Sequence, residues 1–152
     1  MAIRIINRQK KIKLDTKRVR RSALKLLKEL DCRDREVNIL FTDDAGIREF
    51  NLNYLGKDKP TNVISFAMSE GEPCITGSCE HEVLGDIVIS VETAERDGKK
   101  TGLALEHEID FLMIHGILHL LGFDHVGSRA KAEKMATKEK ELFFHLNGFE
   151  IE

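Results

Sequence analysis

The hydrophobic and polar positions follow two different periods along the chain, and these periods predict its strands and helices. Short apolar or alternating runs rich in β-branched residues predict four strands, at 2–6, 36–42, 62–68 and 82–91. Apolar residues at helical spacing predict five helices, at 15–30, 43–54, 92–100, from Gly102 to near Leu121, and 128–146. No repeat or Pro/Ser-rich linker divides the chain. We therefore expect one α+β domain over 1–152, with a small, mostly four-stranded sheet packed by helices.

Glycine and proline mark two irregular places in this pattern. Gly56 and Pro60 indicate a loop over 55–61, between a helix and a strand. Gly85 lies inside the fourth strand, where a glycine indicates a β-bulge or a close approach of another backbone.

Composition excludes several classes of protein. The 152 residues are 41% hydrophobic and 33% charged, which is typical of a soluble globular domain. No apolar run approaches the roughly 18–20 residues of a membrane span, and the first residues are too charged for a signal peptide. Three cysteines without a CxxC pair indicate a reducing compartment, so we expect a cytoplasmic protein. Cys74 and Cys79, with His81 nearby, match no familiar zinc spacing and are interpreted as ordinary loop residues.

The net charge of −2 hides a strong asymmetry. Residues 1–35 contain thirteen Lys or Arg and four Asp or Glu, whereas residues 36–152 contain eleven and twenty-two. A basic segment of this density attracts polyanions such as nucleic acid. It is equally compatible with a solvated surface rich in lysine, and the sequence leaves both interpretations open.

The chemistry is concentrated in the segment HGILHLLGFDH, at 115–125. His115 and His119 are four residues apart and therefore share one face of a helix. Gly122 can end that helix and reverse the chain, which would bring His125 to the other two. Unpaired imidazoles in so apolar a segment would cost about 1–3 kcal/mol each, and a shared metal satisfies all three. The sequence thus predicts a metal site at the end of a buried central helix, with a fourth position left for water.

The same spacing occurs in the metzincin metalloproteases, which carry a general-base glutamate directly after the first histidine. Gly116 occupies that position here, so the usual proton acceptor of peptide hydrolysis is missing. A metalloprotease-like hydrolase therefore remains only an alternative.

Three blocks carry a resemblance to a known family: GKDKPTNVISF at 56–66, LGDI at 84–87, and the histidine block itself. With these blocks the sequence resembles the YbeY endoribonucleases, also described as rRNA maturation factors. The resemblance implies a metal-dependent, single-strand-specific endoribonuclease that matures the 3′ end of small-subunit rRNA and acts in ribosome quality control. It also implies one Zn²⁺ per chain on His115, His119 and His125. The expected partners are single-stranded RNA, ribosomal RNA and the small ribosomal subunit, with no membrane and no DNA.

One position departs from the family pattern. Members commonly have a functionally important arginine just before the glycine of the GKD block, and this chain has Leu55. Leucine cannot bind phosphate oxygens bidentately as a guanidinium does. Lys57 and Lys59 are candidates to supply a cation from the same loop, and Ser65 is a candidate substrate contact.

The sequence leaves the mechanism open between two routes. A three-histidine zinc can lower the pKa of bound water to about 7, or it can bind a phosphate oxygen while the RNA 2′-hydroxyl attacks. Asp124 is a candidate to orient a histidine ligand, or else an ordinary turn carboxylate. Asp86 and Glu108 are more remote candidates for a proton acceptor. A further alternative is a non-catalytic, zinc-stabilised ribosome assembly factor, which Leu55 favours.

Overall fold

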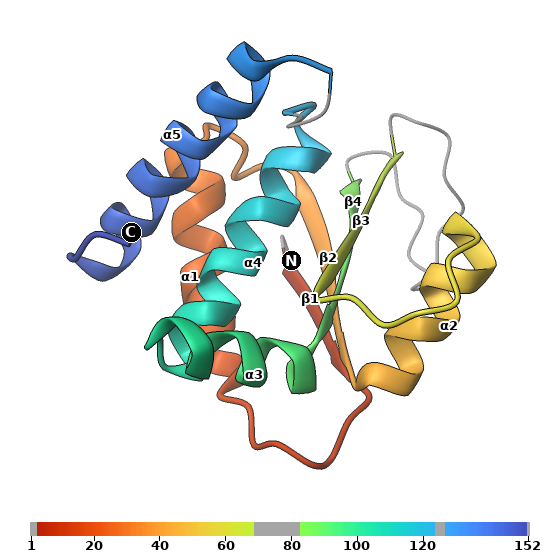
Figure 1. Cartoon of the computed structure of the whole chain (residues 1–152). Coiled ribbons are helices and arrows are strands. Elements are labelled where there is room, and N and C mark those ends of the chain that lie inside the picture. Colours follow the sequence, from red (N-terminus) through yellow and green to blue (C-terminus); the bar gives the residue numbers. More distant parts are fainter. Residues whose placement is uncertain (1–2, 69–82, 124–126, 152) are drawn as a thin grey trace.

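The computed structural model describes residues 3–68, 83–123 and 127–151 (Figure 1). The elements in chain order are β1 (Ile3–Asn7), α1 (Thr16–Glu29), β2 (Glu36–Thr42), α2 (Asp44–Leu55), β3 (Val63–Ala67), β4 (Val83–Ser90), α3 (Val91–Thr101), α4 (Leu105–Leu120) and α5 (Arg129–Asn147). Each of them corresponds to one predicted element. The predicted α+β fold with a four-stranded sheet is confirmed.

The sheet has the strand order β1-β2-β4-β3. β1, β2 and β4 run parallel, whereas β3 pairs antiparallel with β4 and forms one edge. β2 and β4 lie at the centre and are almost entirely buried, which explains their continuous apolar runs.

Helices cover the two faces of the sheet unequally (Figure 1). On one face α1 lies over β1 and α4 over β3 and β4, with α3 and α5 packed against α4. This face holds the larger core, which includes Leu26, Ile39, Ile87, Met113 and Phe143. On the other face α2 covers a smaller core around Ile47 and Phe66. α4 is thus the central helix, and ten of its sixteen residues are buried.

Gly85 shows both features that its position predicts. The pairing of β2 with β4 shifts between Glu36 and Val37, so that Gly85 faces Val37 and Leu84 is the extra residue of a bulge. A Cβ on Gly85 would lie 2.4 Å from the Phe66 carbonyl oxygen and 2.5 Å from Cδ2 of Leu120. The missing side chain therefore allows the last turn of α4 to approach the β3–β4 edge.

A buried ion pair fixes α4 against its neighbours. Nη2 of Arg18 on α1 lies 2.8 Å from Oδ2 of Asp110, whose side chain is 0% exposed. The same guanidinium donates to the Glu106 carbonyl on α4 and to Oδ1 of Asn147 on α5. One cation of the basic segment is therefore structural. Among the residues that the structure describes, no helix has the length and apolar character to cross a membrane.

Candidate active site

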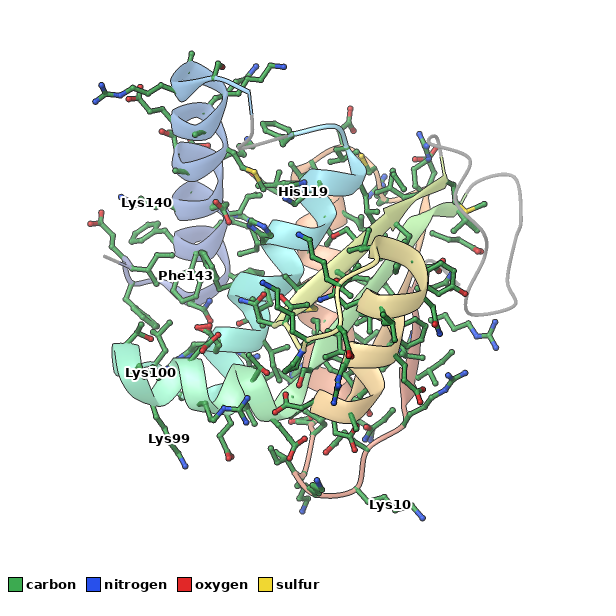
Figure 2. The ribbon with its side chains drawn as sticks, turned by 45° about the vertical axis from the view of Figure 1, so that its right-hand side comes forward. Lys10, Lys99, Lys100, His119, Lys140 and Phe143 are labelled. Atoms are coloured by element: carbon green, nitrogen blue, oxygen red, sulfur yellow. The ribbon has the colours of Figure 1, made fainter. Side chains whose placement is uncertain are left out.

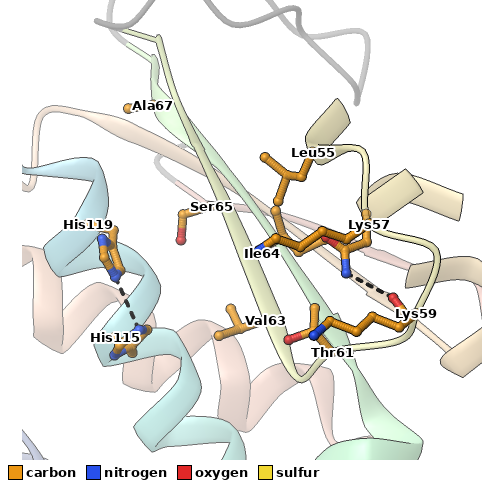
Figure 3. Close-up of a pocket in the computed structure, with 11 residues that line it drawn as sticks. Leu55, Lys57, Lys59, Thr61, Val63, Ile64, Ser65, Ala67, His115 and His119 are labelled. Atoms are coloured by element: carbon orange, nitrogen blue, oxygen red, sulfur yellow. Dashed lines mark hydrogen bonds between the residues drawn. The ribbon is translucent and has the colours of Figure 1, made fainter. Parts of the chain in front are cut away.

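His115 and His119 lie on successive turns of α4 and face each other (Figure 3). Their ring centroids are 4.6 Å apart, and their Nε2 atoms are 3.1 Å apart. Both residues are half-buried. The spacing of four residues thus brings the two Nε2 atoms together on the partly exposed side of α4.

A carboxylate from another helix contacts the far side of the first ring. Oε2 of Glu139 on α5 lies 2.9 Å from Nδ1 of His115. A carboxylate only accepts, so Nδ1 carries the hydrogen, and Nε2 of the neutral ring is left with a lone pair toward His119. Glu139 is not among the site residues that the sequence predicts. Its signal is an acidic residue on the buried stripe of α5, between Met135 and Leu142.

The geometry of the pair fits a zinc ion. Two nitrogen atoms bound to one tetrahedral zinc, with Zn–N bonds of about 2.0–2.1 Å, are about 3.3 Å from each other. This separation is close to the 3.1 Å observed between the Nε2 atoms of His115 and His119. A carboxylate on the other ring nitrogen is the usual support of a metal-binding histidine. His125 and Asp124 lie outside the described residues, and within the described ones no group of three or more candidate ligands converges. The three-histidine site therefore stays a prediction, and the structure brings together the rings of His115 and His119.

Gly116 packs directly against the sheet. A Cβ at this position would lie 3.0 Å from Cδ1 and Cγ2 of Ile87 on β4. The position that holds the protease glutamate therefore faces the core, and a glutamate here would have no room to reach a substrate.

The histidines form one wall of an open cleft of about 420 Å³ (Figure 3). β3 forms its base, and the opposite wall is the end of α2 with the segment that follows it. The lining residues are Asn51, Leu55, Lys57, Lys59, Thr61, Val63, Ile64, Ser65, Ala67, His115 and His119.

All three predicted substrate-binding residues line this cleft. The side chain of Ser65 points from β3 toward α4, and its Oγ lies 3.4 Å from the Gly116 carbonyl oxygen. Lys57 and Lys59 are exposed on the opposite wall, where Nδ2 of Asn51 donates to the Lys59 carbonyl at 2.8 Å. Leu55, in the position of the family's arginine, is 51% exposed. The cleft therefore places two cations opposite two imidazoles.

The two remote proton-acceptor candidates lie elsewhere. Asp86 is on the α2 face of the sheet, beside Val88 in the strand alternation, and accepts from Nδ2 of Asn38 at 2.9 Å.

Glu108 lies two turns before His115 and lines a separate cavity with Phe111. Burial, followed by repulsion from Asp97, raises the pKa of Glu108. The structure thus brings neither carboxylate to the cleft. Cys74, Cys79 and His81 lie outside the described residues.

Paired imidazoles facing two lysines across an open cleft are the features of a hydrolytic enzyme with an anionic substrate. A family model described as Endoribonuclease YbeY matches residues 4–147. The chain belongs to this family and is a nuclease that hydrolyses phosphodiester bonds. The resemblance predicted from the three sequence blocks is confirmed.

The relatives match nearly the whole chain. The chain is 49% identical to an endoribonuclease YbeY of Syntrophus aciditrophicus, over 100% of this chain and 94% of the relative. It is 45% identical to that of Geobacter sulfurreducens, over 94% of each. The solution structure of TM1509 from Thermotoga maritima matches with a TM-score of 0.66 and 27% identity, over 96% of this chain and 89% of that one. These matches overturn the metalloprotease and the non-catalytic alternatives.

Proposed function

We propose that the protein is a Zn²⁺-dependent, single-strand-specific endoribonuclease that matures ribosomal RNA in the cytoplasm. Its substrate is the 3′ end of the small-subunit rRNA, and the same activity serves ribosome quality control. The observation that carries the proposal is the 3.1 Å approach of two Nε2 atoms at a cleft whose other wall presents Lys57 and Lys59. An opening of about 420 Å³ has the size of a small-ligand site, which favours an unpaired nucleotide over a duplex.

The residues of the site have different roles in the reaction. His115, His119 and His125 would hold the zinc, which when bound supplies water of lowered pKa or a contact to a phosphate oxygen. Lys57 and Lys59 attract the phosphates on either side of the scissile bond. The Ser65 hydroxyl, at the base of the cleft, hydrogen-bonds the substrate. Asp124 orients an imidazole ligand.

A second RNA contact is proposed on the basic segment. Lys17, Arg21, Lys25 and Lys28 are exposed on α1. Figure 2 shows Lys10, from the same segment, at the opposite end of the molecule from His119. Such a surface fits a large substrate, such as rRNA within the small subunit, that extends beyond the cleft. Reversing the four α1 charges should flatten the slope of log affinity against log salt by up to about 3. An unchanged slope would assign these residues to ordinary solvated surface.

The deciding experiment is cleavage of a labelled single-stranded RNA by zinc-loaded protein. His119→Ala, prepared identically, controls for contaminating nucleases, and a duplex of the same sequence tests strand specificity. We expect the wild type alone to cleave, and only the single strand. Equal cleavage by both proteins would contradict the proposal.

The same pair of proteins then tests the ribosomal part of the proposal. Small subunits carrying unprocessed 3′ ends replace the free RNA, and the new termini are mapped. Cleavage of free RNA without maturation of the subunits would overturn the ribosomal substrate and leave the nuclease.

A further inference from the structure

Glu139 is a buried carboxylate in an unfavourable place. It lies on the apolar stripe by which α5 packs against α4, and its side chain is 12% exposed. Within residues 3–68, 83–123 and 127–151, its one side-chain partner is the imidazole of His115. Burying a carboxylate opposes folding unless it is well compensated, and a leucine or methionine would suit the stripe better. The residue therefore has a purpose other than packing.

The contact determines how His115 presents its ring. Oε2 of Glu139 accepts the hydrogen of Nδ1 at 2.9 Å, which fixes both the tautomer and the ring orientation. The Nε2 lone pair then lies 3.1 Å from Nε2 of His119, at the wall of the cleft. Without the carboxylate, Nδ1 loses this acceptor, and a hydrogen on Nε2 or a changed ring orientation would remove the lone pair from this point.

We infer that Glu139 is the positioning residue of His115: α5 holds the α4 imidazole with Nε2 unprotonated and directed at the cleft. The effect on the tautomer requires no ligand. The effect on metal affinity rests on the proposed zinc site. Glu139 itself acts through His115 and touches no substrate.

The first experiment measures the tautomer in metal-free protein. Long-range ¹H–¹⁵N NMR at alkaline pH distinguishes a protonated Nδ1 from a protonated Nε2, and His115→Gln identifies the signals. We expect the Nδ1–H form in the wild type and a mixture, or mainly the Nε2–H form, in Glu139→Leu. The same tautomer in both proteins would overturn the inference.

The second experiment measures zinc affinity by competition with a chromogenic chelator. Glu139→Leu should weaken binding about 10–100-fold, the usual effect of removing such a support. Glu139→Gln should fall between, because its amide oxygen still accepts from Nδ1 but carries no charge. Glu141→Leu is the matched control on the same helix, exposed and paired with Lys138 at 3.5 Å, and should bind like the wild type.

The two experiments separate the inference from the proposed function. A wild type that binds no zinc but has the expected tautomer would contradict the zinc site and leave the positioning role intact. Equal zinc affinity in the wild type and Glu139→Leu would overturn the role toward the metal. Thermal melts accompany each variant. If Glu139→Leu does not fold, Glu139→Ala, which also removes the acceptor of Nδ1, provides the tautomer readout, and Glu139→Gln tests the role toward the metal by its intermediate zinc affinity.

Discussion

The two walls of the cleft are built in opposite ways. The histidine wall is a helix with most of its surface in the core, and a buried ion pair and the Glu139 contact hold it in place. The lysine wall consists of the last turn of α2 and the segment that follows it, and every residue from 52 to 60 is exposed. Groups that need fixed geometry thus lie on the rigid element, and groups that need only charge lie on the surface segment. Substitutions should therefore damage the fold on one wall and adjust binding on the other.

The largest effect is expected at Gly116, on the rigid wall. Gly116→Glu would add a side chain where Ile87 already lies 3.0 Å from the position of a Cβ, and would bury a carboxylate. Overpacking by itself costs about 1–3 kcal/mol, and burial of the charge adds to it, so the variant should unfold or lose more than about 3 kcal/mol. Denaturant titration followed by circular dichroism measures the loss.

Two companion variants test the reason given. Gly116→Ala should be destabilised less, and Ile87→Val in the same chain should relieve part of that cost. Ala130→Glu, at an exposed position of α5, should melt like the wild type. A stable Gly116→Glu would show that the wall is far less rigid than its packing indicates.

The ion pairs behind the two walls provide the next test. Arg18→Ala would leave the buried carboxylate of Asp110 without its guanidinium and should cost about 3–5 kcal/mol of unfolding free energy. Near the other wall, Nε of Arg48 lies only 2.6 Å from Oδ1 of Asp58, but both side chains are more than half exposed. Arg48→Ala should leave the melting temperature unchanged, because water screens an exposed pair. Equal losses in the two variants would contradict the contrast between the walls.

The sequence predicts the parts of the site that depend on local spacing. His115 and His119 are one helical turn apart, so the helical period alone brings their rings together. Gly56 and Pro60 predict the loop that carries the two lysines. The position of Gly85 inside a strand predicts the bulge and the close backbone approach found there. Each of these features depends on residues that are close in the sequence, or on the backbone conformation of a single residue.

The sequence could not predict the contacts that depend on packing between distant elements. Glu139 is 24 residues from His115, and the contact exists only because α5 lies along α4. Asp86 is a candidate proton acceptor by its chemistry alone, because strand alternation does not reveal which face of the sheet carries the histidines. Glu108 shares the helix of the histidines, yet two turns of helix put it beside another cavity.

On the lysine wall, Leu55→Arg should strengthen the binding of single-stranded RNA without destabilising the fold. Leu55 is 51% exposed and lines the cleft, so a guanidinium there can reach a bound phosphate. We expect the Kd for single-stranded RNA to fall about 3–10-fold, and the salt slope to steepen by about 0.7, the value of one added phosphate contact. Leu52→Arg is the matched control, since Leu52 is 46% exposed on the same helix but does not line the cleft. Equal gains in both variants would indicate a general charge effect.

The smallest effect is expected at Glu108, near the start of the rigid helix, where burial opposes a charge. Burial and repulsion from Asp97 raise the pKa of Glu108, although the helix N-terminus favours its ionised form by about 0.3–1 kcal/mol. Burial is the largest cause of the upward shift, and we expect it to outweigh the helix dipole. A raised pKa means that the native state holds this proton more tightly than the unfolded chain does. Its stabilising effect is complete below the unfolded carboxyl pKa and disappears as the pH rises through the native value.

Glu108→Gln should therefore melt about 1–3 °C above the wild type at neutral pH, with the difference vanishing at acidic pH, where both side chains are neutral. Glu106→Gln is the matched control: it is exposed in the same first turn, so it loses the dipole interaction without relieving any burial. It should melt at or slightly below the wild type. If Glu108→Gln behaves like Glu106→Gln, the first turn of α4 is open enough to solvate a carboxylate, and the rigid wall begins only nearer the histidines.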